Sequence, residues 1–297
     1  MARIGMFMNL AATDPQVQPR KDAFLKGLGS LGGSVQFTYE HGAADGKYDD
    51  HAAKLVEQSP DLLFASCGPS FWALQRALKN ANKSIPIVFS GMIDSINAGR
   101  LSAVGNPGVT GYVSYDSSLC VTWLSLLKKI VPTLKRVAVT RDSDRRAGMT
   151  QYYAIQSAAL SFGLTVSPIE VGDADAGITA AIKAFAASPN GGMIVPAGTL
   201  TACRRKVIID AANQNKLHTI YPNRMYVESG GLIAHGAITL ELYESAAAYA
   251  AKILDGRDPT ALPIVHNQKF ETVVNGKTAK AVDVDLSVLQ PEPVQVI

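Results

Sequence analysis

The sequence has little cysteine, little histidine and no long apolar run, and each scarcity argues against a class of protein. Its three cysteines, Cys67, Cys120 and Cys203, are odd in number, far apart and without a C-x-x-C pair, which argues against a disulfide scaffold and against a zinc site. The five histidines are scattered and form no H-x-x-x-H pair. We therefore expect no metal and no cofactor. No apolar segment approaches the length of a membrane helix.

Charge of either sign is also sparse. Charged residues make up 18% of the chain and the net charge is only +3. The basic residues are spread out, so nothing indicates a nucleic-acid-binding face. The apolar fraction of 47% over 297 residues is that of a globular protein long enough for two domains.

The usual motifs of phosphate binding and catalysis are missing. No G-x-x-x-x-G-K-[ST], G-x-S-x-G or H-E-x-x-H occurs, and no pairing of a nucleophile with a base is visible. We therefore expect that the protein is not an enzyme. Residues 27–32 do match the dinucleotide fingerprint G-x-G-x-x-G. That fingerprint must follow a strand and open a helix, whereas these glycines close a helix that begins near Lys21. We interpret them as a helix end.

What the chain does contain is an alternation of strand-like and helical segments. Such alternation predicts βα units, a parallel sheet and helices on both faces. The expected strands are 4–8, 35–39, 62–65, 87–90 and 109–112, and the expected helices are 21–31, 48–58 and 119–131.

The pattern starts again at Arg136, and five features recur in the same order. The repeat predicts two Rossmann-like lobes, each a parallel sheet flanked by helices. The remaining segments complete these lobes, which we expect to be 1–114 plus 237–263 and 115–236 plus 264–297. The chain then crosses between lobes near 114–117, 236 and 263–267, which predicts a multi-strand hinge.

The turn at residues 67–70 is the first candidate for a binding site. The apolar run 62–65 breaks at Cys67-Gly68-Pro69-Ser70 and restarts with helical spacing. A strand that turns into a helix presents unpaired N–H groups and the positive end of the helix dipole, which bind anions. The alternative is an ordinary βα turn. The repeat gives a second such turn at Pro196–Thr199, so two helix N-termini would face one cleft.

Candidate site residues are those that follow each strand, because ligands of open α/β sheets bind beyond the carboxyl ends of the strands. In the first lobe they are Asn9, Thr13, Cys67, Gly68, Ser70, Trp72, Ser90, Gly91 and Asp94, and Tyr115 lies on the first crossing between the lobes. In the second lobe they are Arg141, Ser143, Pro196, Gly198, Thr199, Tyr221 and Asn223. The mixture of polar and bulky apolar groups favours a small ligand with a charged head and an apolar or aromatic body.

Several of these residues have a structural alternative. Asp94 could bind an ammonium group or cap a short helix. Arg141 could hold a carboxylate or pair with the neighbouring aspartates. Trp72 could belong to the core. Ser70 and Thr199 are plausible helix caps.

Seven short segments, in this order, carry a resemblance to a known family: 3–5 (RIG), 46–49 (GKYD), 85–89 (IPIVF), 106–111 (NPGVTG), 228–232 (ESGGL), 250–256 (AAKILDG) and 275–279 (NGKTA). The chain resembles ABC transporter substrate-binding proteins of the tryptophan/tyrosine type over essentially its whole length. The resemblance implies the type I periplasmic-binding fold, a clamshell that captures a solute and delivers it to a membrane permease. Relatives tend to read Gly-Thr-Pro at residues 68–70 and Asn-Pro-Asp at the turn after Thr140, and this chain departs at both.

Our leading hypothesis is a non-enzymatic protein that binds an aromatic or apolar amino acid or a related carboxylate. The turn Gly68–Ser70 would hold the carboxylate, Asp94 the ammonium, and Trp72, Tyr115 and Tyr221 the body. Its partner would be an ABC permease, and its location periplasmic or extracellular and membrane-associated, with the export signal absent from this chain because residues 3–7 already form a strand.

Two other classes remain open. The effector-sensing core of a transcription regulator shares this fold, but it would need a helix-turn-helix segment, and none precedes Arg3 in this sequence. An enzyme that uses the cleft would turn the bound solute over.

Overall fold

The chain forms two compact units. The structure is a computed structural model that describes residues 1–42, 46–92, 108–115, 118–142, 149–172, 174–290 and 293–297. Unit 1 comprises Met1–Tyr115 and Thr239–Gln268, and unit 2 comprises Asp116–Ile238 and Lys269–Ile297. The chain therefore passes from one unit to the other three times.

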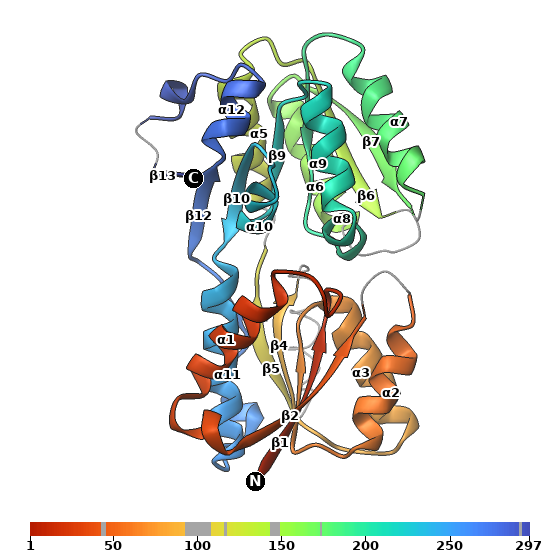
Figure 1. The fold of residues 1–297 in the computed structure, drawn as a ribbon, viewed down its shortest axis with the longest axis vertical. Coiled ribbons are helices and arrows are strands. Elements are labelled where there is room, and N and C mark those ends of the chain that lie inside the picture. Colours follow the sequence, from red (N-terminus) through yellow and green to blue (C-terminus); the bar gives the residue numbers. More distant parts are fainter. Residues whose placement is uncertain (43–45, 93–107, 116–117, 143–148, 173, 291–292) are drawn as a thin grey trace. The chain divides into compact units, whose positions relative to one another are not determined.

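Unit 1 is built on a parallel sheet, whose strands β1 to β5 are drawn in red, orange and yellow in Figure 1. Its order is β11-β5-β4-β3-β1-β2, and every neighbouring pair is parallel. The strands are β1 Ala2–Met8, β2 Val35–His41, β3 Leu62–Ala65, β4 Ile87–Met92, β5 Val109–Val113 and β11 Val265–His266.

Helices cover both faces of this sheet. Leu63 lies in a core cluster with Leu55 and Leu74, whereas the next residue, Phe64, contacts the rings of Phe24 and Tyr243 at 4.7 and 5.3 Å. Successive residues of a strand point to opposite faces, so these contacts place α2 and α3 on one face and α1 and α11 on the other (Figure 1). The helices are α1 Val17–Leu28, α2 Tyr48–Glu57, α3 Gly68–Asn80 and α11 Thr239–Leu254, with 3-10 turns at Gly29–Ser34 and Pro259–Ala261.

Unit 2 repeats this plan with one strand more. Its sheet has the order β13-β12-β10-β9-β8-β6-β7. The strands are β6 Arg136–Asp142, β7 Thr165–Val171, β8 Gly191–Ile194, β9 Thr219–Tyr221, β10 Ile233–Ala237, β12 Phe270–Val274 and β13 Val294–Val296. The prediction of a parallel sheet is wrong at this edge, because β12 runs antiparallel to β10. The helix between these strands, α11, belongs to unit 1, so no crossover helix within unit 2 forces the parallel direction.

The helices of unit 2 also pack on both faces of their sheet. A Cβ atom at Gly191 would lie 2.9 Å from Phe185 of α7, and one at Gly192 would lie 2.8 Å from Leu127 of α5. Because these residues are consecutive in β8, α7 and α5 lie on opposite faces. The helices are α5 Ser118–Ile130, α6 Met149–Ser161, α7 Asp175–Ala186, α8 Thr199–Cys203, α9 Arg205–Gln214, α10 Arg224–Glu228 and α12 Gly276–Ala281, with a 3-10 turn at Leu286–Leu289.

The expected two-lobed α/β architecture is confirmed, with local corrections. Residues 264–268, assigned from the sequence to the second lobe, lie in unit 1, since β11 pairs with β5 there. Ile238 and the residue before it lie in unit 2 rather than in the first lobe. The first helix begins at Val17, four residues before the predicted start, with Pro19 in its first turn.

The glycines of the G-x-G-x-x-G segment do close a helix. α1 ends at Leu28, and Gly29 follows with a φ of 59°. Gly27 lies where α1 meets α11: a Cβ atom there would be 2.2 Å from the carbonyl oxygen of Glu244 and 2.8 Å from Cβ of Ala247. This glycine therefore permits close packing of two helices.

None of the helices in the described ranges combines the length and the apolarity needed to span a bilayer. The three cysteines are free thiols, with Cys67 and Cys120 buried. No group of three or more His, Cys, Asp or Glu side chains within the described ranges is arranged to hold a metal ion.

Gly27→Ala is expected to lower the free energy of unfolding by about 1 to 3 kcal/mol, because the added methyl group would overlap the backbone of α11. Urea denaturation followed by circular dichroism measures the change. Gly33→Ala is the matched control, since a Cβ atom at Gly33 meets nothing within 4 Å. Equal stability of the two variants would contradict the proposed role of Gly27.

Candidate functional site

The strand orders define where a ligand would bind in each unit. In both sheets the first strand lies between the second and the third, as β2-β1-β3 in unit 1 and β7-β6-β8 in unit 2. The chain thus leaves the first strand in one direction and the third strand in the other, which opens a crevice at their carboxyl ends. The residues that follow β1 and β3, and β6 and β8, occupy these positions.

In unit 1 a polar network lies at this point. Asn9 follows β1, and its Oδ1 accepts hydrogen bonds from Nη1 of Arg20 at 3.0 Å and from Oγ of Ser66 at 3.2 Å. Arg20 comes from α1 and is only 5% exposed. Asn9 itself is half-buried. A buried guanidinium group therefore lies directly behind the side chain at the end of β1.

Tyr243 of α11 closes the same network. The Arg20 guanidinium lies 5.7 Å from the centroid of its ring. Burial, the largest effect, raises the pKa of the Tyr243 hydroxyl, while neighbouring Arg20 and Ser66 act in the opposite direction. The phenol therefore stays neutral and can share hydrogen bonds with these groups.

The ends of β4 and β5 add hydroxyl groups. Ser90 and Ser114 are 1% and 2% exposed, and neither Oγ has a hydrogen-bond partner among the described residues. Gly91, near the end of β4, has a φ of 78°, and a Cβ atom there would lie 2.9 Å from the carbonyl oxygen of Ser66 and 3.7 Å from Oγ of Ser114. The ends of three strands thus meet around Gly91, and Tyr115 follows, buried to 6% exposure.

The turn at Cys67–Ser70 satisfies most of its own donors. Cys67 caps α3, its Sγ accepting from the Ser70 N–H, while Oγ of Ser70 accepts from the Cys67 N–H at 3.2 Å and donates to the Cys67 carbonyl at 3.0 Å. Pro69 has no N–H, and the Phe71 N–H donates to the Cys67 carbonyl at 3.0 Å. Among the described residues, the Gly68 N–H is the first-turn donor with no recorded partner, and a Cβ atom at Gly68 would meet nothing within 4 Å. The expected row of open N–H groups is thus reduced to one.

The other candidates of unit 1 lie apart from this network or outside the described residues. Trp72 is half-buried and packs edge-on against Phe71, with ring centroids 5.0 Å apart, on the margin of the core. Thr13 is exposed. Asp94 lies outside the described residues.

In unit 2 the equivalent position holds a carboxylate. Asp142, at the end of β6, is 4% exposed, and its Oδ2 accepts from the Leu200 N–H at 3.4 Å. A Cβ atom at Gly198 would lie 3.2 Å from Oδ1 of Asp142. The start of α8, a helix of only five residues, is thus already faced by an anionic side chain of the protein, so the expectation of a second anion-binding helix start is wrong.

Pro196 and Thr199 belong to the same turn of unit 2. Both are buried, and the Pro196 carbonyl accepts from Oγ1 of Thr201 at 3.5 Å.

Arg141 pairs with a residue that the sequence did not suggest. Its guanidinium group forms a short ion pair with Glu170, its direct neighbour in the β6–β7 register, and it lies 5.2 Å from the centroid of the Tyr152 ring. The hydrogen bond to Glu170 raises the pKa of Arg141. Arg141 therefore forms an ion pair, as one alternative predicted, but its partner is Glu170 on the neighbouring strand β7 and not an adjacent aspartate. Ser143 lies outside the described residues.

Tyr221 is a core residue of unit 2. It is fully buried and stacks on Tyr226, with ring centroids 5.2 Å apart and an interplanar angle of 20°. Burial raises the pKa of its hydroxyl. Asn223 is half-buried and occupies the N-cap position of α10.

Two charged residues at the crevices, Arg20 of α1 and Asp142 at the end of β6, were not among the predicted site residues. Arg20 shares the buried face of α1 with Val17, Phe24 and Leu28, so a charge within an apolar helical stripe was the available signal. Asp142 occupies a buried position at the end of a strand, which the sequence offered only as a neighbour of Arg141.

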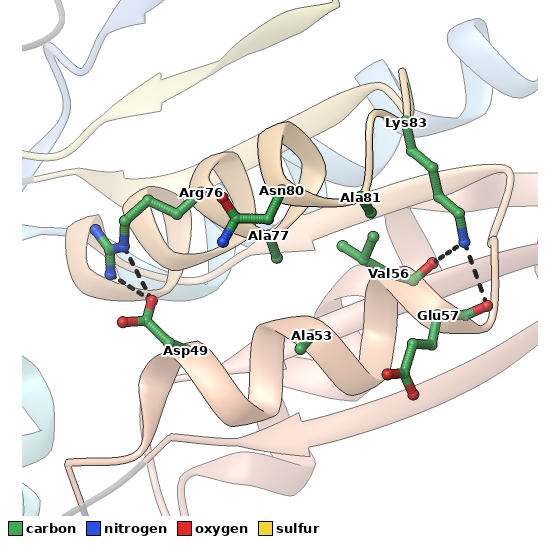
Figure 2. Close-up of a pocket in the computed structure, with 9 residues that line it drawn as sticks. All are labelled: Asp49, Ala53, Val56, Glu57, Arg76, Ala77, Asn80, Ala81 and Lys83. Atoms are coloured by element: carbon green, nitrogen blue, oxygen red, sulfur yellow. Dashed lines mark hydrogen bonds and ion pairs between the residues drawn. The ribbon is translucent and has the colours of Figure 1, made fainter.

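Between α2 and α3 lies a hollow of about 390 Å³, shown in Figure 2. Its apolar floor includes Ala53, Val56 and Ala77. Its cations are engaged locally: Arg76 pairs with Asp49 at 2.6 Å, and Nζ of Lys83 donates to the Val56 carbonyl at 2.8 Å. The hollow therefore offers a ligand little uncompensated charge.

Comparison with known proteins agrees with this geometry. The family model described as ABC transporter substrate binding protein matches residues 14–295. A "Tyrosine-binding protein" of Clostridioides difficile (strain R20291) is 25% identical over 286 residues, which cover 91% of this chain and 78% of the relative.

Solved structures share the fold. The ABC domain from Streptococcus pneumonia in complex with L-Trp has a TM-score of 0.84 at 20% identity, covering 99% of this chain and 100% of the other. A conserved domain protein from Vibrio cholerae has a TM-score of 0.85 at 21% identity, covering 99% of each chain.

Two α/β units, each with its polar residues at the crevice of a doubly wound sheet, define a type I periplasmic-binding-protein fold. The match over nearly the whole chain identifies its family: the protein belongs to the ABC transporter substrate-binding proteins.

Ser70→Ala is expected to lower the free energy of unfolding by about 1 kcal/mol, because the buried hydroxyl makes two hydrogen bonds that hold the start of α3. Chemical denaturation measures the loss. Ser84→Ala, at an exposed serine of the same unit, should stay within about 0.5 kcal/mol of the parent protein. A fully stable Ser70→Ala variant would show that the hydroxyl is not needed for the turn.

Proposed function

We propose that this chain is the extracytoplasmic solute-binding component of an ABC importer, and that its solute is an aromatic or large apolar amino acid or a related carboxylate. The observation that carries the proposal is the family match over residues 14–295, joined to relatives whose names state that they bind tyrosine or L-Trp. The solute is captured as the two units close about the three connecting segments, and it is released to a membrane permease. The protein acts outside the cytoplasm and carries out no chemistry on the solute.

The strand ends of unit 1 support a ligand with a carboxylate. The Gly68 N–H and the buried hydroxyls of Ser90 and Ser114 have no partners among the described residues, so they can pair with ligand oxygens. Arg20 supplies positive charge behind them. Trp72 and Tyr115 are the aromatic side chains of this unit proposed to contact the body of the solute. Asp94 remains the proposed partner of the ammonium group.

Unit 2 contributes fewer polar groups to this proposal than the sequence suggested. Arg141 is held by Glu170 and Tyr221 lies in the core, so neither is needed to contact the solute. Asp142 and Gly198, which meet at the crevice of the sheet, are the stronger candidates of this unit.

A thermal-shift panel tests the proposal. L-tryptophan, L-tyrosine, L-phenylalanine, L-leucine and indole-3-acetate are compared with glucose, myo-inositol and adenosine. A solute present at one hundred times its dissociation constant stabilises the folded protein by about 2.7 kcal/mol and raises the melting temperature accordingly. Stabilisation by a sugar or a nucleoside, with no response to any aromatic or apolar acid, would contradict the proposed solute class.

A further inference from the structure

The orientation of the Asn9 amide follows from its partners. A guanidinium group only donates hydrogen bonds, so the Asn9 atom 3.0 Å from Nη1 of Arg20 must be the oxygen. Ser66 donates a second bond to the same oxygen at 3.2 Å. Both acceptor positions of Oδ1 are therefore occupied from within unit 1, and the amide cannot flip without placing its NH2 group against a cation.

The other end of this amide is then a pair of N–H donors. Nδ2 of Asn9 has no partner among the described residues. Asn9 is half-buried, and its oxygen is covered by Arg20 and Ser66, so the accessible part of the side chain is the NH2 group. It lies at the crevice between β1 and β3, where the Gly68 N–H also has room for a ligand atom.

Resting on the proposed function, we infer that Asn9 is the residue that recognises the carboxylate of the solute. Its Nδ2 donates to one carboxylate oxygen, and Arg20 acts as a positioning residue that orients the amide and adds positive potential behind it. An anionic oxygen is favoured over a neutral carbonyl because the guanidinium charge lies one amide group away in a buried setting. Asn9, directly after β1, and the turn at the start of α3 thus both select for a carboxylate.

Unit 2 provides an internal comparison. Asn9 stands at the same distance from Arg3 as Asp142 does from Arg136, the two residues at which the repeated pattern begins. At this strand end unit 2 has the carboxylate of Asp142, which accepts a hydrogen bond from a backbone N–H of its own chain. Unit 1 has the amide of Asn9, whose N–H donors remain available to a ligand. The difference between the two side chains gives the crevice of unit 1 its preference for a hydrogen-bond acceptor.

Asn9→Asp tests the inference with almost no change in shape. Calorimetric titration compares each acid with a partner in which an uncharged amide or ester replaces the carboxylate: L-tryptophan with L-tryptophanamide, L-tyrosine with L-tyrosinamide, and 4-methyl-2-oxopentanoate with its methyl ester. In the variant the acids should bind roughly ten- to a hundredfold more weakly, whereas the amides and the ester should change little. Asn82→Asp, at an exposed asparagine with the same charge change, should leave every affinity unchanged.

Arg20→Gln tests the positioning role by the same acid-to-amide comparison. Loss of affinity restricted to the acids, with partial recovery in Arg20→Lys, supports orientation and charge behind Asn9. An equal loss of affinity for the acids and for their amides or ester would show that Arg20 has only a structural role. Because Arg20 is buried, unfolding of its variants would leave the decision to Asn9→Asp.

The outcomes separate this inference from the proposed function. If the parent protein binds aromatic acids and Asn9→Asp binds them equally well, only the inference fails. If the oxo acid alone binds and Asn9→Asp loses it, the amino acid part of the proposed solute class fails, the related carboxylate remains, and the inference stands. If the parent protein binds none of the acids, both fail.

Discussion

The close contact of α1 with α11 is the constraint on which unit 1 depends. The two helices come from distant parts of the chain, and Gly27 brings their backbones near enough for Lys26 to pair with Glu244 at 2.8 Å. That contact covers Phe64 with the rings of Phe24 and Tyr243 and completes the core on this face of the sheet. It also brings Tyr243 to Arg20, so the packing that stabilises the unit is the packing that builds the polar network under Asn9.

Much of this architecture could be predicted from local patterns. Alternating strands and helices, and their repetition after Arg136, predict two doubly wound units because the residue patterns report which faces are buried. The direction of β12 could not be predicted in this way. The direction depends on the path of the chain, which leaves unit 2 after β10 and returns from unit 1 to form β12. The residues of β12 alone carry no information about that path.

The candidate site was harder to predict than the fold. Position at a strand end drew attention to Asn9, Ser90 and Gly91, since the carboxyl ends of parallel strands gather at one edge. It could not distinguish a side chain that faces a ligand from one that serves its own turn. Ser70 caps α3, and Tyr221 packs on Tyr226, for reasons that depend on contacts between elements. The role of Arg20 depends on Tyr243 and Ser66, which the sequence separates widely.

The route of the chain also bears on how the protein reaches its native state. The Lys26–Glu244 pair joins residues 218 positions apart, so the face of unit 1 that α1 and α11 share stays only partly covered until most of the chain is present. Contacts of such high sequence separation carry a large loop-closure entropy and form slowly. The first 115 residues therefore lack one of the two helices that cover this face of their sheet until residues 239–254 are present. Folding of the two units is coupled through the shared path of the backbone, and exposed apolar surface on β3 persists until the late helix docks.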